Sequence, residues 1–422
     1  MPGPTATDLQ PNSTKSTKRS SFAALKHRDF RLLWIGQIIS VTGSQMQSVA
    51  INWHVYLLTK SAFALGLVGL FRGAPIIICS LLGGVVADAI NRRRLMVATQ
   101  SVMLVTAALL ALATLLGLES VWPIYVLSAF ASAATAFDTP ARQSLMPTLV
   151  PPADFPNAVS LGLVVFNVAT ICGPALAGFL LAESGPALIY AFNAISFLAV
   201  IAAVLAMRVS GSPELQSGRR EALSFRALKE GLRFVWQTPI IVQTMTLDFA
   251  ATFFASATLL LPIFAKEHLH VDARGFGFLA AAPAIGSVIT ALIMARIGGF
   301  NRQGRLVVVS VAVFGLATVG FGLSTVFWLS MLMLALTGAA DTVSTVLRQT
   351  IRQLVTPNYI RGRMTAINMM FFMGGPQLGE LEAGVVAALI GAPLSVILGG
   401  LGSLICACLA AVKAKHLMEY EG

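Results

Sequence analysis

The chain has 422 residues, of which 56% are hydrophobic and only 11% are charged, whereas an ordinary soluble domain has about 25% charged residues. A soluble protein this apolar could not cover its surface, so the composition excludes soluble enzymes and soluble binding domains. The net charge of +11 is better explained by basic loops on one side of a membrane than by a nucleic-acid partner.

Residues 1–28 are polar and rich in Ser, Thr and Lys, which predicts a disordered cytoplasmic tail. The rest of the chain is dominated by apolar blocks, many of them about 20 residues or longer, enough to cross a hydrocarbon core of about 30 Å as a helix. The blocks fall at 31–58, 62–87, 95–117, 121–138, 157–182, 186–207, 240–265, 273–298, 305–324, 326–347, 363–389 and 391–412. They predict an all-α membrane protein with twelve transmembrane helices.

The Lys and Arg residues alternate strongly across these blocks. With both termini cytoplasmic, 25 of the 29 bases fall in cytoplasmic segments, and Arg348 and Arg352 count among the bases of one such loop. The opposite loops hold only Lys60, Lys266 and Arg274. This bias predicts that both termini lie in the cytoplasm. A bacterial inner membrane is the expected location.

A polar stretch divides the apolar blocks six and six. It predicts an N-terminal bundle at 29–207, a cytoplasmic linker at 208–238, a C-terminal bundle at 239–413 and a short cytoplasmic tail at 414–422. Within and just after the linker, EALSFRALKEGLRFVWQTP (221–239) predicts an amphipathic helix on the inner membrane surface, because its apolar residues share one face. A plain linker and a regulatory site are the two readings of this helix.

The two halves repeat short patterns in the same order. The fourth block leads into AFDTPARQSLMPTLVPP and the tenth into AADTVSTVLRQTIRQLVTP, while the fifth carries CGPALAG and the eleventh GGPQLGE. Duplication predicts two six-helix pseudo-symmetric bundles, as in many secondary transporters. There is no Walker motif, no G-x-S-x-G, no HExxH and no Cys/His cluster. We therefore predict no enzyme activity, no cofactor and no metal site, and an ion gradient as energy source.

The stretch GGVVADAINRRRL (83–95) resembles the loop between the second and third helices of the major facilitator superfamily. FRLLWIGQIISVTGSQM, FDTPARQSLMPTLVP and GPQLGELEAG are similar to the branch that contains the enterobactin exporter and many predicted drug exporters. The resemblance covers nearly all of the chain from residue 22 onward and implies the major facilitator fold. The second half departs from the loop pattern, since MARIGGFNRQGR (294–305) has bases but no acid.

The resemblance implies that this loop belongs to a cytoplasmic gate. Asp88 would cap the start of the eleventh helix, and the three arginines would pair with Asp138, only while the cytoplasmic side is closed. The alternative is an ordinary polar helix end, where a charge costs little. The predicted gate residues are Gly84, Asp88, Arg92, Arg93, Arg94, Asp138 and Arg142.

The fifth block carries Gly173 and Pro174, with Gly178 four residues after the proline. Small residues allow close approach of helices, and proline bends them. The pattern resembles one associated with antiporters in the superfamily, with alanine in place of one of the final glycines. It favours export.

Charged residues inside apolar spans are costly and are therefore candidates for proton coupling. Asp248 and Glu380 are favoured, and Arg72 could instead form a structural ion pair. Glu380 and Glu382 lie about 200° apart on a helix, so the two side chains cannot face one cavity. The full set of candidates is Asp248, Glu380, Arg72, Asp341 and Glu382.

Aromatic and amide side chains suit a large amphipathic ligand. Those expected to line a substrate cavity are Gln45, Gln47, Phe71, Phe166, Asn167, Phe253, Phe254, Asn368 and Phe371. We predict a monomeric, proton-coupled exporter of drugs or siderophores that works by alternating access in the lipid bilayer. The alternatives are an importer or symporter of a nutrient or lysolipid, and a membrane sensor that moves no solute.

Overall fold

The computed structural model of the chain describes residues 22–118, 120–209, 225–254, 257–357 and 360–420. The side chains of several residues within 81–88, 225–231 and 361–374, and that of residue 257, lie outside this description. The described residues form helices and no strand, which confirms the all-α class. Eight of these helical segments are long and apolar enough to cross a membrane. The count of twelve spans remains a prediction.

The first group of helices, called here the N-half, follows the short 3₁₀ turn η1 (Ala23–Lys26). It consists of α1 (Arg28–Thr59), α2 (Ala62–Ala89), α3 (Arg92–Leu115), α4 (Trp122–Leu149) and α5 (Phe155–Ala206). α5 contains two of the predicted blocks. Gly185 lies between them with φ 70° and ψ −173°, a conformation that a residue without a β-carbon adopts readily, and Pro186 follows. Two helices therefore meet at Gly185 in a sharp turn.

The second group, called here the C-half, follows helix α6 (Phe225–Gln237), which lies within the stretch predicted to be an amphipathic helix. Its first predicted block is not one helix. It is divided into α7 (Pro239–Phe254), a 3₁₀ turn η3 (Ala257–Leu260), α8 (Leu261–Ile263) and a π-helical turn η4 (Phe264–His268). The remaining helices are α9 (Ala273–Ile297), α10 (Gln303–Leu323), α11 (Phe327–Val355), α12 (Arg361–Ile390), α13 (Ala392–Lys413) and α14 (Lys415–Met418).

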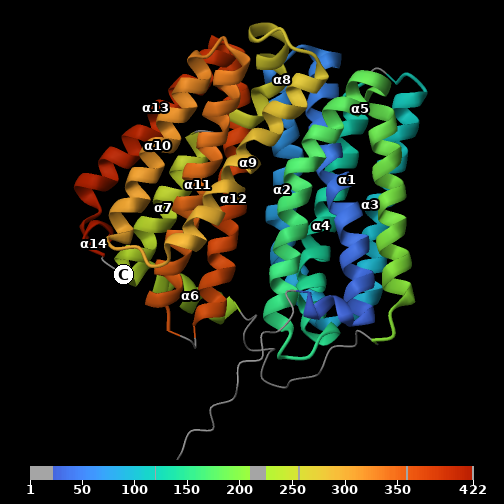
Figure 1. Cartoon of the computed structure of the whole chain (residues 1–422), viewed down its shortest axis with the longest axis horizontal. Helices are drawn as coiled ribbons and strands as arrows, with labels where there is room; N and C mark the ends of the chain where they lie inside the picture. The colour runs from blue at the N-terminus through green and yellow to red at the C-terminus, as the bar shows by residue number, and fades with distance from the viewer. Residues whose placement is uncertain (1–21, 119, 210–224, 255–256, 358–359, 421–422) are drawn as a thin grey trace, which may run out of the picture.

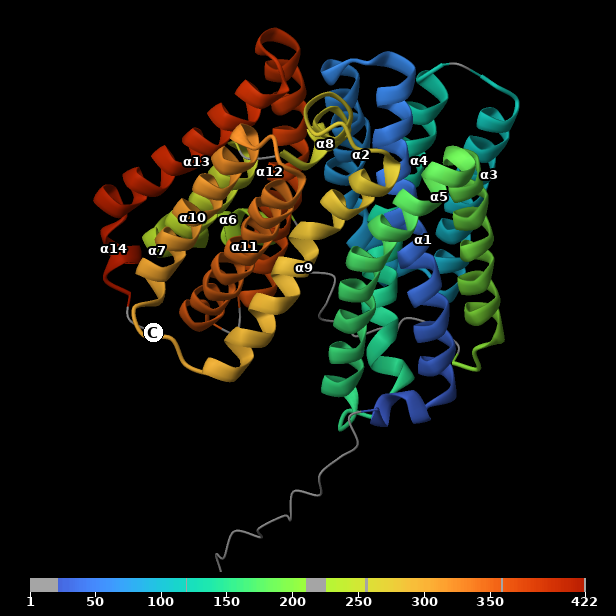
Figure 2. The same ribbon diagram turned by 45° about the horizontal axis from the view of Figure 1, so that its top comes forward.

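The two halves stand side by side and approach each other at the end where α8 lies (Figures 1 and 2). At this end, one apolar cluster combines buried residues of both halves, such as Leu181 and Ala383. The rings of Trp53 and Phe276 stack across the junction with centroids 4.9 Å apart. We call this the shared end. Burial of apolar surface between the halves stabilises their contact there.

At the opposite end, each half has an apolar cluster of its own. One cluster contains Phe30, Leu145 and other residues of the N-half, and a separate one contains Ile241, Leu417 and other residues of the C-half. We call this the split end. Figure 1 shows the two groups of ribbons diverging toward it.

Candidate functional site

α2 and α12 run antiparallel, and three glycines of α2 face α12 at successive turns. The facing pairs, in order from the shared end, are Gly66 with Gly384, Gly69 with Glu380 and Gly73 with Gln377. A β-carbon added to Gly384 would lie 2.5 Å from the Cα of Gly66, closer than side chains tolerate. The halves therefore contact each other backbone to backbone at this point.

Glu380 lies at the centre of this contact. A β-carbon on Gly69 would come within 2.8 Å of its carboxylate, so the glycine provides the space for the acid. Arg72 of α2 is close enough to interact electrostatically with Glu380, and its Nη1 donates to Ser48 Oγ at 2.8 Å. Two predicted coupling residues are thus brought together from different halves. Glu382, two residues further on, faces another side of α12.

The glycine–proline pattern of α5 lies at the second junction between the halves. Gly173, Pro174 and Gly178 are all buried. A β-carbon on Gly277 of α9 would lie 2.7 Å from both the Pro174 carbonyl oxygen and the Gly178 Cα. Gly173 faces α1, where a β-carbon would lie 2.6 Å from that of Gln45. The pattern therefore lets α5 pack closely on α1 and α9 at once.

Polar contacts at the shared end also join the halves. Tyr56 donates a hydrogen bond to Glu267, and Arg274 forms an ion pair with Glu183. The latter pair is exposed, with 47% of the arginine side chain and 63% of the glutamate side chain accessible. Exposed pairs of this kind contribute little stability, so apolar burial is the main contact energy here.

The three consecutive arginines make contacts within the N-half. Asn91 caps α3 by accepting hydrogen bonds from the backbone N–H groups of Arg93 and Arg94. Arg92 is buried and donates to the Ser144 carbonyl at 3.1 Å, while Arg93 donates to the Val209 carbonyl at 2.8 Å. These contacts tie the start of α3 to α4 and to the end of α5.

The N-half surrounds its buried charges with neutral partners. Asp138 is 3% exposed and accepts from Thr99 Oγ1 and Gln100 Nε2, each at 3.0 Å. Arg142 of α4 donates to the Gln37 amide of α1. None of the arginines at the start of α3 is among the partners of Asp138 in this conformation.

That pairing was predicted only for a molecule closed at the cytoplasmic side, so it remains a prediction. Asp88 lies in the last turn of α2. Its side chain, and the surroundings of Gly84 in the same helix, lie outside the description.

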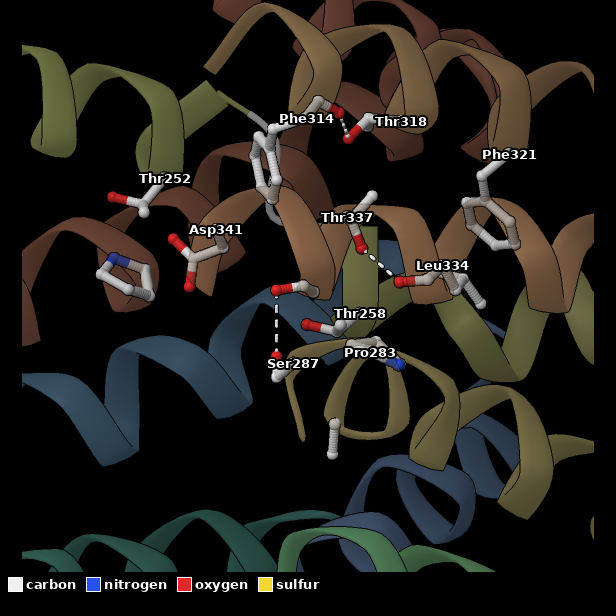
Figure 3. Close-up of a pocket in the computed structure, with 13 residues that line it drawn as sticks. Thr252, Thr258, Pro283, Ser287, Phe314, Thr318, Phe321, Leu334, Thr337 and Asp341 are labelled. Atoms are coloured by element: carbon white, nitrogen blue, oxygen red, sulfur yellow. Dashed lines mark hydrogen bonds between the residues drawn. The ribbon is translucent and has the colours of Figure 1, made fainter. Parts of the chain in front are cut away.

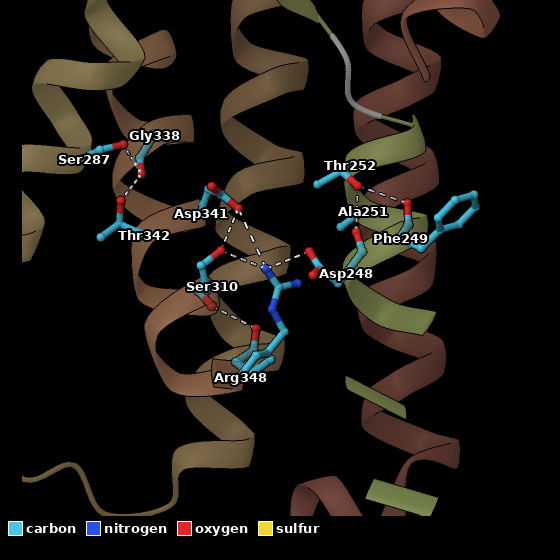
Figure 4. Close-up of polar contacts among 12 residues, drawn as sticks. Asp248, Phe249, Ala251, Thr252, Ser287, Ser310, Gly338, Asp341, Thr342 and Arg348 are labelled. Carbon is cyan, nitrogen blue, oxygen red and sulfur yellow. Dashed lines mark hydrogen bonds and ion pairs between the residues drawn. The ribbon is translucent and has the colours of Figure 1, made fainter. Parts of the chain in front are cut away.

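The C-half, by contrast, contains a buried ionic network (Figure 4). Asp248 of α7 has 5% of its side chain exposed, and its Oδ1 lies 2.8 Å from Arg348 Nη2 of α11. The same Nη2 lies 3.8 Å from Asp341, whose side chain is 48% exposed. Arg352 Nη1 lies 3.9 Å from Asp248 and also donates to Asn368 of α12. Two arginines and two aspartates therefore balance in charge.

The network corrects the sequence-based assignment of two bases. Arg348 and Arg352 were counted as loop residues, but α11 continues to Val355 and both side chains are buried. The reason is that a buried carboxylate compensates them, which hydropathy alone does not detect. The two arginines are four residues apart, which puts both on one helical face. This spacing was the feature of the sequence that could have indicated their shared environment. The charge bias remains one-sided without them.

Three of the residues expected to line a substrate cavity make packing contacts within the N-half, and their role in substrate binding stays a prediction. Gln47 is buried and accepts from Asn193 at 2.7 Å. Phe71 stacks on Tyr125 with centroids 5.1 Å apart. Gln45 packs against α5 as described above. Polar and aromatic residue types cannot by themselves distinguish an internal pair from a ligand contact.

The other expected cavity residues differ in their surroundings. Phe166 and Asn167 are exposed on α5. Phe253 and Phe254 contact each other edge to face near the end of α7, with centroids 5.2 Å apart. Asn368 is occupied by the ionic network, and the side chain of Phe371 lies outside the described residues. In the described part of the chain, no group of three or more His, Cys, Asp or Glu residues could hold a metal ion.

Comparisons with known proteins agree with this architecture. Residues 19–421 match the family described as transmembrane secretion effector. The sequence is 26% identical to the enterobactin exporter of Shigella boydii serotype 18 and 25% identical to that of Citrobacter koseri, with 94% of each chain covered.

Solved structures of transporters share the fold. A POT family transporter has a TM-score of 0.72 at 11% identity, covering 95% of this chain and 100% of its own. The nucleoside transporter NupG has a TM-score of 0.67 at 14% identity, covering 93% of this chain and 99% of its own. At these identities, the likeness concerns the fold alone.

Proposed function

The chain belongs to the transmembrane secretion effector family of the major facilitator superfamily, and we propose that it is a proton-coupled exporter of small amphipathic molecules. Its family and its relatives are membrane transporters rather than enzymes, and the chain is an integral membrane protein. The relatives named as enterobactin exporters support a substrate of siderophore or drug type. The bacterial inner membrane is the proposed location.

The observation that carries this proposal is the difference between the two ends of the molecule. The halves share an apolar cluster at one end and have separate clusters at the other. The shared end contains Lys60, Lys266 and Arg274, the few bases that the charge bias assigns to the outer side. The proposed conformation is therefore closed to the outside, and an exporter would load its substrate from the cytoplasm.

Alternating access then requires the halves to separate at the shared end and meet at the split end. The glycine contacts of α2 with α12 and of α5 with α9 would open in this motion. Asp88 and the arginines at the start of α3 would close the split end, as the superfamily resemblance implies. Asp88→Asn should then lower turnover while the protein keeps its fold, measured as transport rate and thermal unfolding of the same preparation.

We assign proton coupling to Glu380. Its carboxylate lies against Gly69 and within electrostatic reach of Arg72, both of the other half, so the motion that separates α2 from α12 changes its surroundings. Protonation would then favour one conformation over the other. Asp248 was equally favoured from the sequence, but it is held by Arg348 inside a single half, which supports a structural role.

Everted membrane vesicles with an imposed pH gradient test this assignment. A fluorescent amphipathic dye should accumulate inside them, and a protonophore should abolish the accumulation. Glu380→Gln should remove the dependence on the gradient, whereas the matched variant Glu382→Gln should keep it. Accumulation that persists with the protonophore would contradict proton coupling, and equal loss in both variants would contradict the role of Glu380.

A further inference from the structure

A cavity of about 230 Å³ lies within the C-half (Figure 3). The residues that line it come from α7, η3, α9, α10, α11 and α12, and none of them belongs to the N-half. They are Thr252, Thr258, Pro283, Ala284, Ser287, Phe314, Thr318, Phe321, Leu334, Thr337, Gly338, Asp341 and Pro376. Its wall therefore belongs to one side of the interface between the halves, where the proposed transport cycle operates.

The hydroxyl groups around this cavity mostly donate their protons to backbone carbonyls. Ser287 donates to Gly338 at 3.0 Å, Thr337 to Leu334 at 2.6 Å, Thr318 to Phe314 at 2.9 Å and Thr252 to Asp248 at 2.9 Å. A hydroxyl used in this way presents only oxygen lone pairs to a ligand. The two prolines in the wall have no backbone N–H to offer. The polar part of the wall thus accepts hydrogen bonds and hardly donates any.

Asp341 is the one charged side chain among the described residues that line the cavity. Asp341 has 48% of its side chain exposed, and it is held only loosely, with Arg348 at 3.8 Å and Thr345 at 3.4 Å. Arg348 is bound more closely by Asp248, at 2.8 Å. In addition, Thr252 lies near the C-terminal end of α7, where the helix dipole places partial negative charge. A cation entering beside Asp341 would leave the closer ion pair intact.

The rest of the wall is apolar and partly aromatic. Phe321 and Leu334 are buried and lie on the side away from Asp341, while Phe314 lies near it (Figure 3). Aromatic faces attract cations as well as apolar groups. The volume is below the roughly 300–1,000 Å³ of sites for drug-sized ligands. A small ligand with an apolar body and a positive head fits these walls, and a complete siderophore does not.

We propose that this cavity is a binding site for a small organic cation, an aromatic primary amine whose ammonium group donates to Asp341 and the wall hydroxyls. Its ring would lie against Phe314 and Phe321. The ammonium has three donors, which complement a wall of acceptors. The carboxylate gives the site its preference for charge, and the apolar end limits the length of the ligand.

Titration calorimetry of the full-length protein in lipid nanodiscs, with empty nanodiscs as reference, tests the site with three probes of equal size. Phenethylammonium should bind about tenfold or more tightly than neutral 2-phenylethanol, because an ionised hydrogen bond is the stronger one. Phenylacetate should bind most weakly. Equal affinity for the cation and the anion would overturn the proposal.

Two variants separate charge from shape. Asp341→Asn should remove the preference for the cation while 2-phenylethanol still binds, and Ala284→Phe should fill the cavity and abolish binding of both. The exposed Glu419→Gln is the matched control for loss of a carboxylate and should bind as the unmodified protein does. If Asp341→Asn keeps the preference, the site is wrong. These readouts need no transport, so they are independent of the vesicle experiment above.

Discussion

The two halves use the same place in the fold in different ways. In the N-half, Arg142 of α4 reaches the neutral amide of Gln37, the tenth residue of α1. In the C-half, Arg348 of α11 reaches the carboxylate of Asp248, the tenth residue of α7. Each arginine precedes a glutamine in the repeated sequence pattern. The matching helix pairs thus share an arginine contact, which is a charge–amide contact in the N-half and an ion pair in the C-half.

This difference divides the proposed tasks between the halves. The charged side chains of the N-half mainly form hydrogen bonds with amides, hydroxyls and carbonyls. These contacts stabilise a single arrangement of its helices. The C-half collects two arginines and one further aspartate around Asp248, and that second acid, Asp341, faces a cavity. A bound cation would therefore find a carboxylate to compensate its charge in the C-half.

The largest expected effect comes from breaking the ion pair of the C-half. Asp248→Asn leaves Arg348 buried without a charged partner at close range, which should destabilise the protein by about 3–5 kcal/mol. The N-half counterpart, Gln37→Leu, should cost only about 1.5–3 kcal/mol, the value of a hydrogen bond to a charged group. Unfolding in a graded mixture of mild and denaturing detergent measures both.

The double variant Asp248→Asn with Arg348→Gln provides the control. It removes one charge of each sign, so the remaining charges of Arg352 and Asp341 still balance. The double variant should therefore regain much of the stability that Asp248→Asn loses. Equal losses in Asp248→Asn and Gln37→Leu would show that the two contacts are alike in energy, and the division of tasks would then be wrong.

The sequence predicted the class of fold and the positions of most helical segments, because hydropathy directly reports burial in lipid. It also singled out Glu380 as a candidate, since an acid in an apolar span is costly wherever it faces, and its role in coupling stays a prediction. It did not predict partners. Gln47 pairs with Asn193, a partner that the sequence did not indicate, and Arg348 was assigned to a loop, yet it lies in the core. Pairings between distant helices depend on packing, which residue type and spacing do not specify.

An intermediate effect is expected in the N-half at Gln47. Gln47→Leu leaves the Nδ2 group of Asn193 without its acceptor in a buried place, which should cost about 1–3 kcal/mol. Adding Asn193→Leu should recover part of this, because both polar groups are then gone. Substrate affinity, measured by competition with the dye, should stay the same. A change in affinity with unaltered stability would support the prediction that Gln47 lines the substrate cavity.

The smallest effect is expected where the halves meet in water, at the ion pair of Arg274 with Glu183. Both side chains are about half exposed or more, and exposed pairs contribute about 0–1 kcal/mol. Glu183→Gln should therefore leave unfolding nearly unchanged, and raising the salt concentration should have the same negligible effect on the unmodified protein. Unlike the C-half network, this pair joins the two halves. Any effect of Glu183→Gln should therefore appear in the equilibrium between the conformations closed at the shared end and closed at the split end. Cysteine accessibility at the split end would measure that equilibrium. A loss of stability comparable to that of Asp248→Asn would mean that charge, and not shared apolar surface, holds the shared end together.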